Sequence, residues 1–154
     1  MSEAPAVNEP VTAEYAKPLP EMSPVSKPFW DAAKEHRLLI QRSQKTGKAV
    51  FYPRPVSPYG PKDELEWVEA TGKGMVYSYT VARRPTAPQW ANEGPLVIAI
   101  VELEEGARMT TNIVQCDPDS VHIGMAVTVV FEDVTPEVTL VKFKPVGEPL
   151  VASS

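Results

Sequence analysis

The stretch PLVIAIVELEEGARMTTNIV, residues 95–114, decides the fold class of this chain. It contains two runs rich in β-branched side chains, residues 96–103 and 108–115, separated by the turn residues EEGA. β-Branched residues favour the pleated backbone of a strand, whereas glycine and acidic residues favour turns. The stretch therefore predicts two strands of a β-sheet.

Four further runs of the same kind flank this stretch, and few gaps between the runs are long enough for a helix. Short strands at this spacing are typical of a small sandwich or barrel, and a five-stranded OB-fold barrel fits best. The exception is the proline-rich gap RRPTAPQWANEGP, residues 83–95, because loops of this length are often functional. The four runs are LEWVEA (65–70), MVYSYTVA (75–82), AVTVVFED (126–133) and VTLVKFK (138–144).

The segment ahead of the strands predicts one short helix, over residues 27–37. Ser26 is a residue type that caps helix N-termini, and Pro28 is tolerated in the first turn. The helix has an apolar side that either the domain or a partner must cover. That side consists of Phe29, Trp30 and Ala33.

The first 25 residues carry five prolines and almost no periodic apolar pattern. Such a stretch buries too little surface to offset its ordering entropy, so it predicts a flexible or extended arm. Two interpretations stay open, a disordered tail and a strap that orders along a partner subunit.

Composition limits the function classes. The chain has 154 residues, 43% of them apolar, which suits one domain with a core rather than two. The formal net charge is −5 and the 15 Lys and Arg residues are scattered, so no nucleic-acid partner is expected. A single cysteine, Cys116, excludes an internal disulfide framework and a multi-cysteine zinc site.

The start MSEAPAVNEP has neither the basic nor the apolar region of a signal peptide. No apolar run approaches the roughly 18–20 residues needed to cross a bilayer. We therefore expect a cytoplasmic protein without a membrane role.

The order and spacing of three segments carry a family resemblance. FYPRPVSP (51–58), TGKGMVYSYT (71–80) and IGMAVTVVFE (123–132) together resemble the DUF35 family, over about residues 27–146. The resemblance implies a helix, a rubredoxin-like zinc ribbon and an OB-fold. On this chain it predicts an arm (1–25), a helix (26–38), a ribbon-like segment (39–64), an OB-fold (65–146) and a tail (147–154).

The zinc-binding members of that family carry two C-x2-C pairs, and none of those cysteines is present here. The pattern falls on Ser43 and Thr46, and on Ser57 and Gly60. Structural zinc needs thiolate or imidazole ligands, so we expect a ribbon without zinc. The substitutes available from the sequence are prolines at 53, 55, 58 and 61, and aromatic packing from Phe51, Tyr52, Tyr59 and Trp67.

The resemblance also implies a function. DUF35 proteins resemble non-catalytic accessory subunits of thiolase-superfamily enzymes, which form or cleave carbon–carbon bonds of acyl-CoA by thiolase or retro-aldolase chemistry. Such a subunit would stabilise its catalytic partner, in an α2β2 complex by analogy, and help form its CoA or acyl-CoA site. The residues predicted to contact partner or CoA are Phe51, Tyr52, Pro53, Arg54 and Pro55 of the ribbon, and Arg83, Arg84 and Trp90 of the long loop.

The sequence predicts no catalytic site of its own. No catalytic signature frames any serine, and we interpret the two histidines, His36 and His122, as a helix-end residue and a solvated loop residue. Cys116 lacks a neighbour that would activate its thiol. Gly72–Gly74 predicts a turn between strands, and the carboxylates at 63, 64, 66 and 69 predict a solvated face.

Two alternative functions remain. A free-standing acyl-CoA-binding barrel would need no partner, although a lone small barrel rarely binds so large a ligand tightly. A single-stranded nucleic-acid module would need aromatics interleaved with a basic groove. Tyr77 and Tyr79, at the same-face spacing of a strand, are the one feature in its favour.

Overall fold

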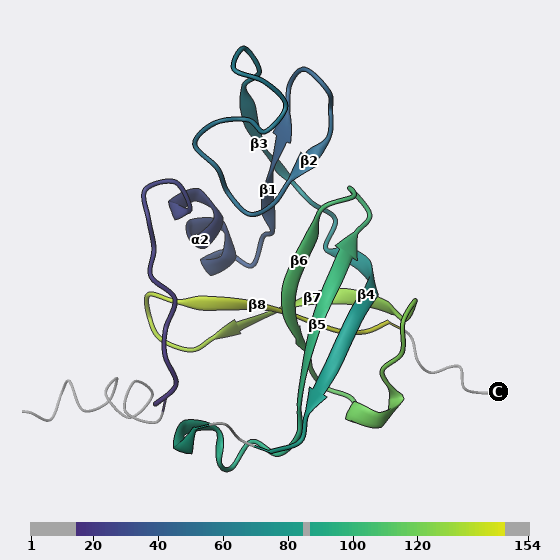
Figure 1. The fold of residues 1–154 in the computed structure, drawn as a ribbon. Helices are drawn as coiled ribbons and strands as arrows, with labels where there is room; N and C mark the ends of the chain where they lie inside the picture. Colours follow the sequence, from purple (N-terminus) through teal and green to yellow (C-terminus); the bar gives the residue numbers. More distant parts are fainter. Residues whose placement is uncertain (1–14, 85–86, 147–154) are drawn as a thin grey trace, which may run out of the picture.

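The computed structural model describes residues 15–84 and 87–146 (Figure 1). No helix within these residues is long and apolar enough to span a membrane. The predictions for most of the N-terminal arm and for the C-terminal tail concern residues outside the described part. The elements are helix α2 (Lys27–Lys34), strands β1 (Leu39–Ser43), β2 (Ala49–Val50), β3 (Leu65–Glu69), β4 (Lys73–Ala82), β5 (Leu96–Leu103), β6 (Arg108–Ile113), β7 (Ala126–Asp133) and β8 (Thr139–Pro145), and the 3-10 helices η1 (Pro88–Trp90) and η2 (Pro118–Ser120).

Helix α2 ends three residues earlier than predicted, at Lys34. The N–H of Arg37 bonds to the carbonyl of Ala32 at 2.9 Å, and the N–H of His36 to that of Ala33 at 2.8 Å. His36 itself is left-handed, with φ 60°. These two bonds and the left-handed residue form a Schellman motif, which satisfies the last carbonyls and stops the helix.

The apolar side of α2 is covered by the domain itself. Phe29 and Ala33 are buried and Trp30 is half-buried, where the helix contacts β1, β7 and β8. Ser26 does not cap the helix with its side chain; its hydroxyl donates instead to the carbonyl of Ser23 at 3.3 Å. The helix is therefore held by packing more than by capping.

A small antiparallel sheet of order β2-β1-β3 lies beside α2 and next to the barrel (Figure 1). In its register Gln41 of β1 lies opposite Val50 on one side and Trp67 on the other. Neither β1 nor β2 was expected from the sequence. The run 65–70 was expected in the barrel, and this was wrong, because β3 pairs with β1. We call residues 39–69, this sheet and its turns, the ribbon.

The five remaining strands close into a barrel of order β4-β5-β6-β8-β7, which confirms the OB-fold prediction. Along β5, Val97, Ala99, Val101 and Leu103 are buried, as expected when alternate side chains point inward. The parallel contact between β6 and β8 is limited to one residue pair, Ile113 with Phe143. Beside this ladder pair, the N–H of Val114 donates to the carbonyl of Phe143 at 2.8 Å and the Thr111 hydroxyl to the carbonyl of Val141 at 2.9 Å.

Glycines at the start of β4 allow two backbones to approach closely. A Cβ on Gly74 would lie 2.5 Å from the carbonyl oxygen of Glu102 on β5. A Cβ on Gly72, whose φ is 84°, would lie 2.5 Å from Cγ1 of Val129 on β7. The predicted turn is therefore also the point where β4 is pressed against both neighbouring strands.

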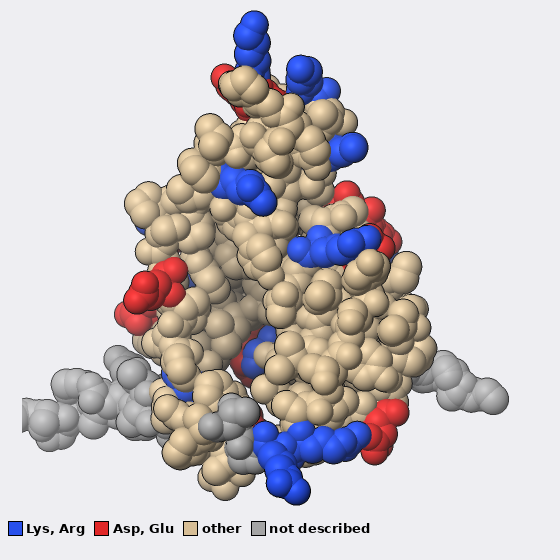
Figure 2. All heavy atoms as spheres, viewed as in Figure 1, with Lys and Arg blue, Asp and Glu red and all other residues tan. Residues whose placement is uncertain are grey.

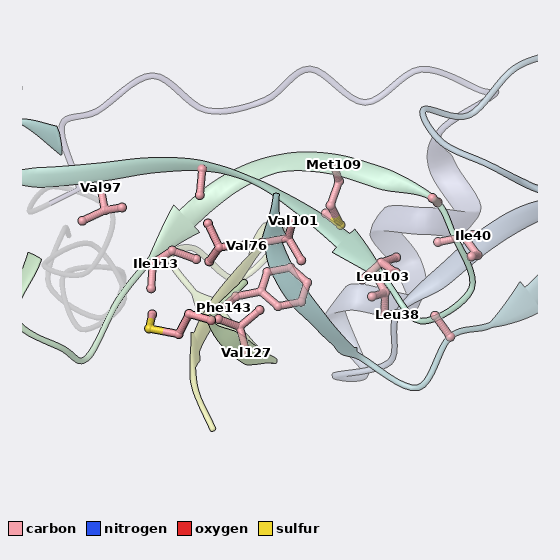
Figure 3. Close-up of a cluster of buried hydrophobic side chains, with 14 of the residues drawn as sticks. Leu38, Ile40, Val76, Val97, Val101, Leu103, Met109, Ile113, Val127 and Phe143 are labelled. Atoms are coloured by element: carbon pink, nitrogen blue, oxygen red, sulfur yellow. The ribbon is translucent and has the colours of Figure 1, made fainter. Parts of the chain in front are cut away.

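Ribbon, helix and barrel share one hydrophobic core. Figure 3 shows Leu38, just before the ribbon, and Ile40, at its start, near Leu103 and Met109 of the barrel. Phe143 has no exposed surface. Because a shared core couples the parts, we expect them to unfold together.

Candidate functional site

The segment that follows β2 joins the ribbon to the barrel through aromatic contacts. The ring of Phe51 meets that of Phe29 edge-on, with centroids 5.5 Å apart. The ring of Tyr52 lies 4.6 Å from that of Phe51, and its hydroxyl accepts a hydrogen bond from the N–H of Thr110 on β6 at 3.0 Å. Tyr52 nevertheless remains 53% exposed, so its hydroxyl is fixed by a hydrogen bond while about half of the residue faces solvent.

These aromatics form one wall of a groove of about 460 Å³. Figure 2 shows a hollow on this face of the molecule, between the side carrying α2 and the barrel. Its floor is formed by β6 and β8, through residues 109–112 and 140–142. The groove therefore lies over the two strands whose ladder pairing is limited to one residue pair. Its aromatic wall consists of Phe29, Trp30, Phe51 and Tyr52, with Pro53 beside them.

The backbone of Arg54 is fixed by hydrogen bonds, whereas its side chain is exposed. The buried amide of Gln41 accepts from the N–H of Arg54 at 2.7 Å and donates to its carbonyl at 3.0 Å. The guanidinium is exposed and makes no hydrogen bond or ion pair with any described residue. It lines a second pocket of about 380 Å³, together with Tyr59 and Arg108. The next residue, Pro55, is exposed.

The predicted loop residues lie elsewhere. The β4–β5 hairpin carries the loop at the end of the barrel away from the ribbon (Figure 1). Arg83 forms an exposed ion pair with Asp119 at 2.6 Å, Arg84 is exposed, and Trp90 is half-buried in η1. The structure therefore divides the predicted site residues into two separate groups, one on the ribbon and one on this loop.

The four positions where zinc-binding relatives would carry cysteines do lie in two turns of the ribbon, but their chemistry does not fit a metal. The hydroxyls of Ser43 and Ser57 both donate to Oδ2 of Asp63, the former at 2.5 Å. Gly60 offers no side chain. Within the described residues, no group of three or more His, Cys, Asp or Glu side chains could hold a metal ion.

The prediction of a solvated carboxylate face is wrong for Asp63, which is only 8% exposed. Hydrogen bonds from Ser43 and Ser57 hold the pKa of the Asp63 carboxyl below its usual range. Of the other carboxylates at this face, Glu66 pairs with Arg42 and Glu69 with Arg37 at the surface.

His36 makes a contact that its position at a helix end does not reveal. Its Nε2 lies 3.1 Å from Oδ2 of Asp133 on β7, and its ring stacks on Phe131 with centroids 5.2 Å apart. The Thr139 hydroxyl also donates to Asp133, at 2.5 Å. Hydrogen bonds from Thr139 and then from His36 hold the pKa of Asp133 below its usual range. This cluster ties the end of α2 to the barrel.

Tyr77 and Tyr79 do not share a face, so that part of the nucleic-acid hypothesis was wrong. A β-bulge between Val76 and Ser78 shifts the register, and Tyr79 lies opposite Ala99, a buried residue. Tyr77 lies on the outer surface, where the guanidinium of Arg108 stacks 3.8 Å from its ring centroid.

The remaining candidates for chemistry have ordinary surroundings. His122 is exposed, and its ring nitrogen Nδ1 lies 3.1 Å from the carbonyl of Ser120. Burial raises the pKa of the Cys116 thiol, which favours the less reactive thiol over the thiolate. Cys116 lies beside the Ser120 hydroxyl and the Asp117 carboxylate, of which the carboxylate also raises the thiol pKa, and His122 contacts a backbone carbonyl.

Two family models match this chain. The model of the rubredoxin-like zinc ribbon domain of ChsH2 matches residues 30–56, and that of the C-terminal OB-fold domain of ChsH2 matches residues 67–132. The first match runs from α2 into the ribbon, and the second runs from β3 through β7 of the barrel.

Named relatives agree with these models. A probable enoyl-CoA hydratase alpha subunit of Thermomonospora curvata is 44% identical over 118 residues, 76% of this chain and 36% of the relative. The chain thus spans about a third of that protein. A DUF35 domain-containing scaffold protein of Methanothermobacter thermautotrophicus is 44% identical over 109 residues, 66% of this chain and 81% of the relative.

A solved structure has the same fold. It is a chain of an Ltp2-ChsH2(DUF35) aldolase, 38% identical, with a TM-score of 0.74 over 84% of this chain and 100% of that one. Identity at this level over the whole of a solved chain, together with both domain models and the scaffold relatives, establishes the family. The chain belongs to the DUF35 family.

Proposed function

We propose that this chain is a non-catalytic accessory subunit of a thiolase-superfamily acyl-CoA enzyme that forms or cleaves carbon–carbon bonds, of the thiolase or retro-aldolase type. The observation that carries the proposal is the 38% identity to a chain of an aldolase that it covers completely. The relatives named as alpha subunits of acyl-CoA hydratases support an acyl-CoA enzyme more broadly.

The chemistry of the described residues supports an accessory role. His36 is engaged by Asp133, His122 is a surface residue, and the pKa of Cys116 is raised rather than lowered. The described contacts of His36 are Asp133 and Phe131, neither of which is a nucleophile, and a catalytic cysteine needs a lowered thiol pKa. The proposal therefore assigns bond-making and bond-breaking to the partner subunit.

The ribbon offers the better candidate for the contact with this partner. Tyr52 and Val56 are 53% and 70% exposed, and the Arg54 guanidinium lies beside them in sequence without a described partner. Aromatic residues and arginine are enriched in the cores of interfaces, and arginine also pairs with phosphate oxygens such as those of CoA. We assign Phe51–Pro55 to the partner interface and to the edge of the CoA site.

The loop at the opposite end would form a second contact. Arg83, Arg84 and Trp90 are too far from the ribbon in the fold to belong to the same patch (Figure 1). Both contacts fit an α2β2 complex, in which two copies of this chain flank a dimer of the partner. This stoichiometry is proposed by analogy with other closed, symmetric assemblies, and we propose the cytoplasm as its location.

Reconstitution tests the proposal. The chain is co-expressed with the acyl-CoA enzyme subunit encoded in its host, and turnover of acyl-CoA is measured with and without it. We expect the partner to be inactive or unstable alone and active with this chain. Equal activity and stability of the partner alone would refute the accessory role.

The second candidate is a free-standing acyl-CoA-binding protein, favoured by the aromatic groove of about 460 Å³. It predicts that CoA or acyl-CoA raises the Tm of the isolated chain. The accessory-subunit proposal predicts no such shift until the partner is added, so one thermal-shift series separates the two.

A further inference from the structure

The two turns of the ribbon meet at one carboxylate. Oδ2 of Asp63 accepts the hydroxyl protons of both Ser43 and Ser57, and Oδ1 accepts the backbone N–H of Lys45 at 2.8 Å. The N–H of Asp63 in turn donates to the carbonyl of Gly60 at 3.2 Å. Asp63 therefore touches three segments of chain that the sequence separates by up to 20 residues.

The two serine hydroxyls also accept hydrogen bonds from the backbone of their own turns. Oγ of Ser43 accepts the N–H of Thr46 at 3.0 Å, and Oγ of Ser57 accepts the N–H of Tyr59 at 3.0 Å. Each hydroxyl thus accepts from its own turn and donates to the shared carboxylate. Both turns are closed in the same way, and the closures depend on one common acceptor.

All four former ligand positions take part in this arrangement. Ser43 and Ser57 bond to Asp63 through their side chains, Gly60 through its carbonyl, and Thr46 through one intervening hydroxyl. A zinc site places a cation among four negative ligands. Here the signs are reversed, because an anion lies among O–H and N–H donors, and hydrogen bonds to an ionised acceptor are the strong ones.

Because this arrangement is buried, losing one of its hydrogen bonds would cost stability. Ser43 is fully buried and Asp63 is 8% exposed, so neither can exchange its partners for water at little cost. The lowered pKa of Asp63 agrees with a carboxylate that is ionised at neutral pH. An ionised carboxylate has about four acceptor sites, enough for the donors gathered around it.

We infer that the Asp63 carboxylate takes the structural place of the zinc ion, so that the ribbon and the surface it carries fold without metal. Of the substitutes suggested by the sequence, Phe51 and Trp67 pack against the core, whereas Tyr59 is 38% exposed and Pro55 and Pro58 lie at the surface, so the Asp63 hydrogen bonds add what these side chains do not supply. The inference concerns the isolated chain and does not rest on the proposed accessory function.

The first test is metal analysis and chelation of the full chain, purified from zinc-supplemented culture. We expect far less than one zinc per chain, and the same Tm before and after a strong zinc chelator. One zinc per chain, with a Tm that falls when the zinc is removed, would overturn the inference.

The second test uses Asp63→Asn, which keeps the shape of the side chain but replaces one acceptor oxygen by an NH2 group. That group is itself a hydrogen-bond donor and would face the donors that surround Asp63. We expect a lower Tm and loss of amide-exchange protection at Lys45 and Thr46. Glu64→Gln is the matched control, because Glu64 is the exposed neighbouring carboxylate, and it should change neither. Unchanged protection in Asp63→Asn would contradict the assigned role.

A third variant keeps the inference testable if Asp63→Asn does not fold. Ser57→Ala removes one donor from the second turn only. Because both turns share one carboxylate, we expect faster amide exchange at Thr46 in the first turn. Ser78→Ala, on the exposed part of β4, is the control. If exchange at Thr46 is the same in Ser57→Ala as in the native chain, the turns are independent and the inference fails.

Discussion

Replacing Phe29 by alanine tests whether helix, ribbon and barrel form one cooperative unit. Phe29 is only 6% exposed and meets Trp30 and Phe51 edge-on, with centroids 4.9 and 5.5 Å apart. Truncating a buried phenylalanine costs about 3–5 kcal/mol, through lost burial and the cavity left behind. A free-energy change of 1 kcal/mol moves Tm by roughly 3 °C in a chain of this size, so we expect a fall of roughly 10–15 °C.

The assay is thermal unfolding followed by circular dichroism and by calorimetry, at fixed pH and salt. Val56→Ala is the control, because Val56 is 70% exposed in the same ribbon and should change stability by less than about 0.5 kcal/mol. We expect a single transition in both variants. If the Tm of Phe29→Ala falls by less than about 3 °C, or if the barrel unfolds in a separate early transition, helix, ribbon and barrel do not share one core.

Three further predictions follow from individual contacts. Gly74→Ala would place a methyl group against the carbonyl of Glu102, so we expect a loss of about 1–3 kcal/mol in urea unfolding, and a neutral effect would show that β4 can move aside. The pKa of Asp133 is lowered in the folded chain, so the carboxylate stabilises the fold fully above its pKa in the unfolded chain, about 4. This stabilisation is lost as the pH falls through the pKa of Asp133 in the folded chain. The Tm difference between the native chain and Asp133→Asn should therefore shrink below about pH 4, and a constant difference down to about pH 2 would contradict the ionised pair. Arg54→Ala should weaken the complex or its affinity for CoA while leaving the Tm of the isolated chain unchanged, and full affinity and turnover in the assembled enzyme would exclude Arg54 from the interface.

Much of the barrel could be predicted from the sequence, because its strands are runs of β-branched residues with clear turn residues between them. The predicted bounds of β5 and β7 equal those of the structure, and the others differ by a few residues. Strand β3 was assigned to the wrong sheet, since local pattern predicts that a strand exists but not which strand it pairs with. The bulge that separates the faces of Tyr77 and Tyr79 is likewise a property of pairing.

The ribbon shows more clearly what could not be predicted from the sequence. Four carboxylates follow one another between residues 63 and 69, and nothing in their spacing distinguishes the buried Asp63 from the three others. The available signal was serine at the first position of both pairs where zinc-binding relatives carry cysteine, because hydroxyls shielded from water need an acceptor. His36 and Asp133 are 97 residues apart, so their contact follows from tertiary structure alone.

The most direct test of the accessory-subunit proposal is the native mass of what this chain binds in its own host. The tagged chain is captured under mild conditions, and intact complexes are measured by native mass spectrometry, with acyl-CoA turnover assayed on the same sample. We predict a stoichiometric complex with a thiolase-like subunit, two copies of each, that turns over acyl-CoA. Recovery of the chain alone, as a monomer in a fraction without acyl-CoA activity, would contradict the proposal.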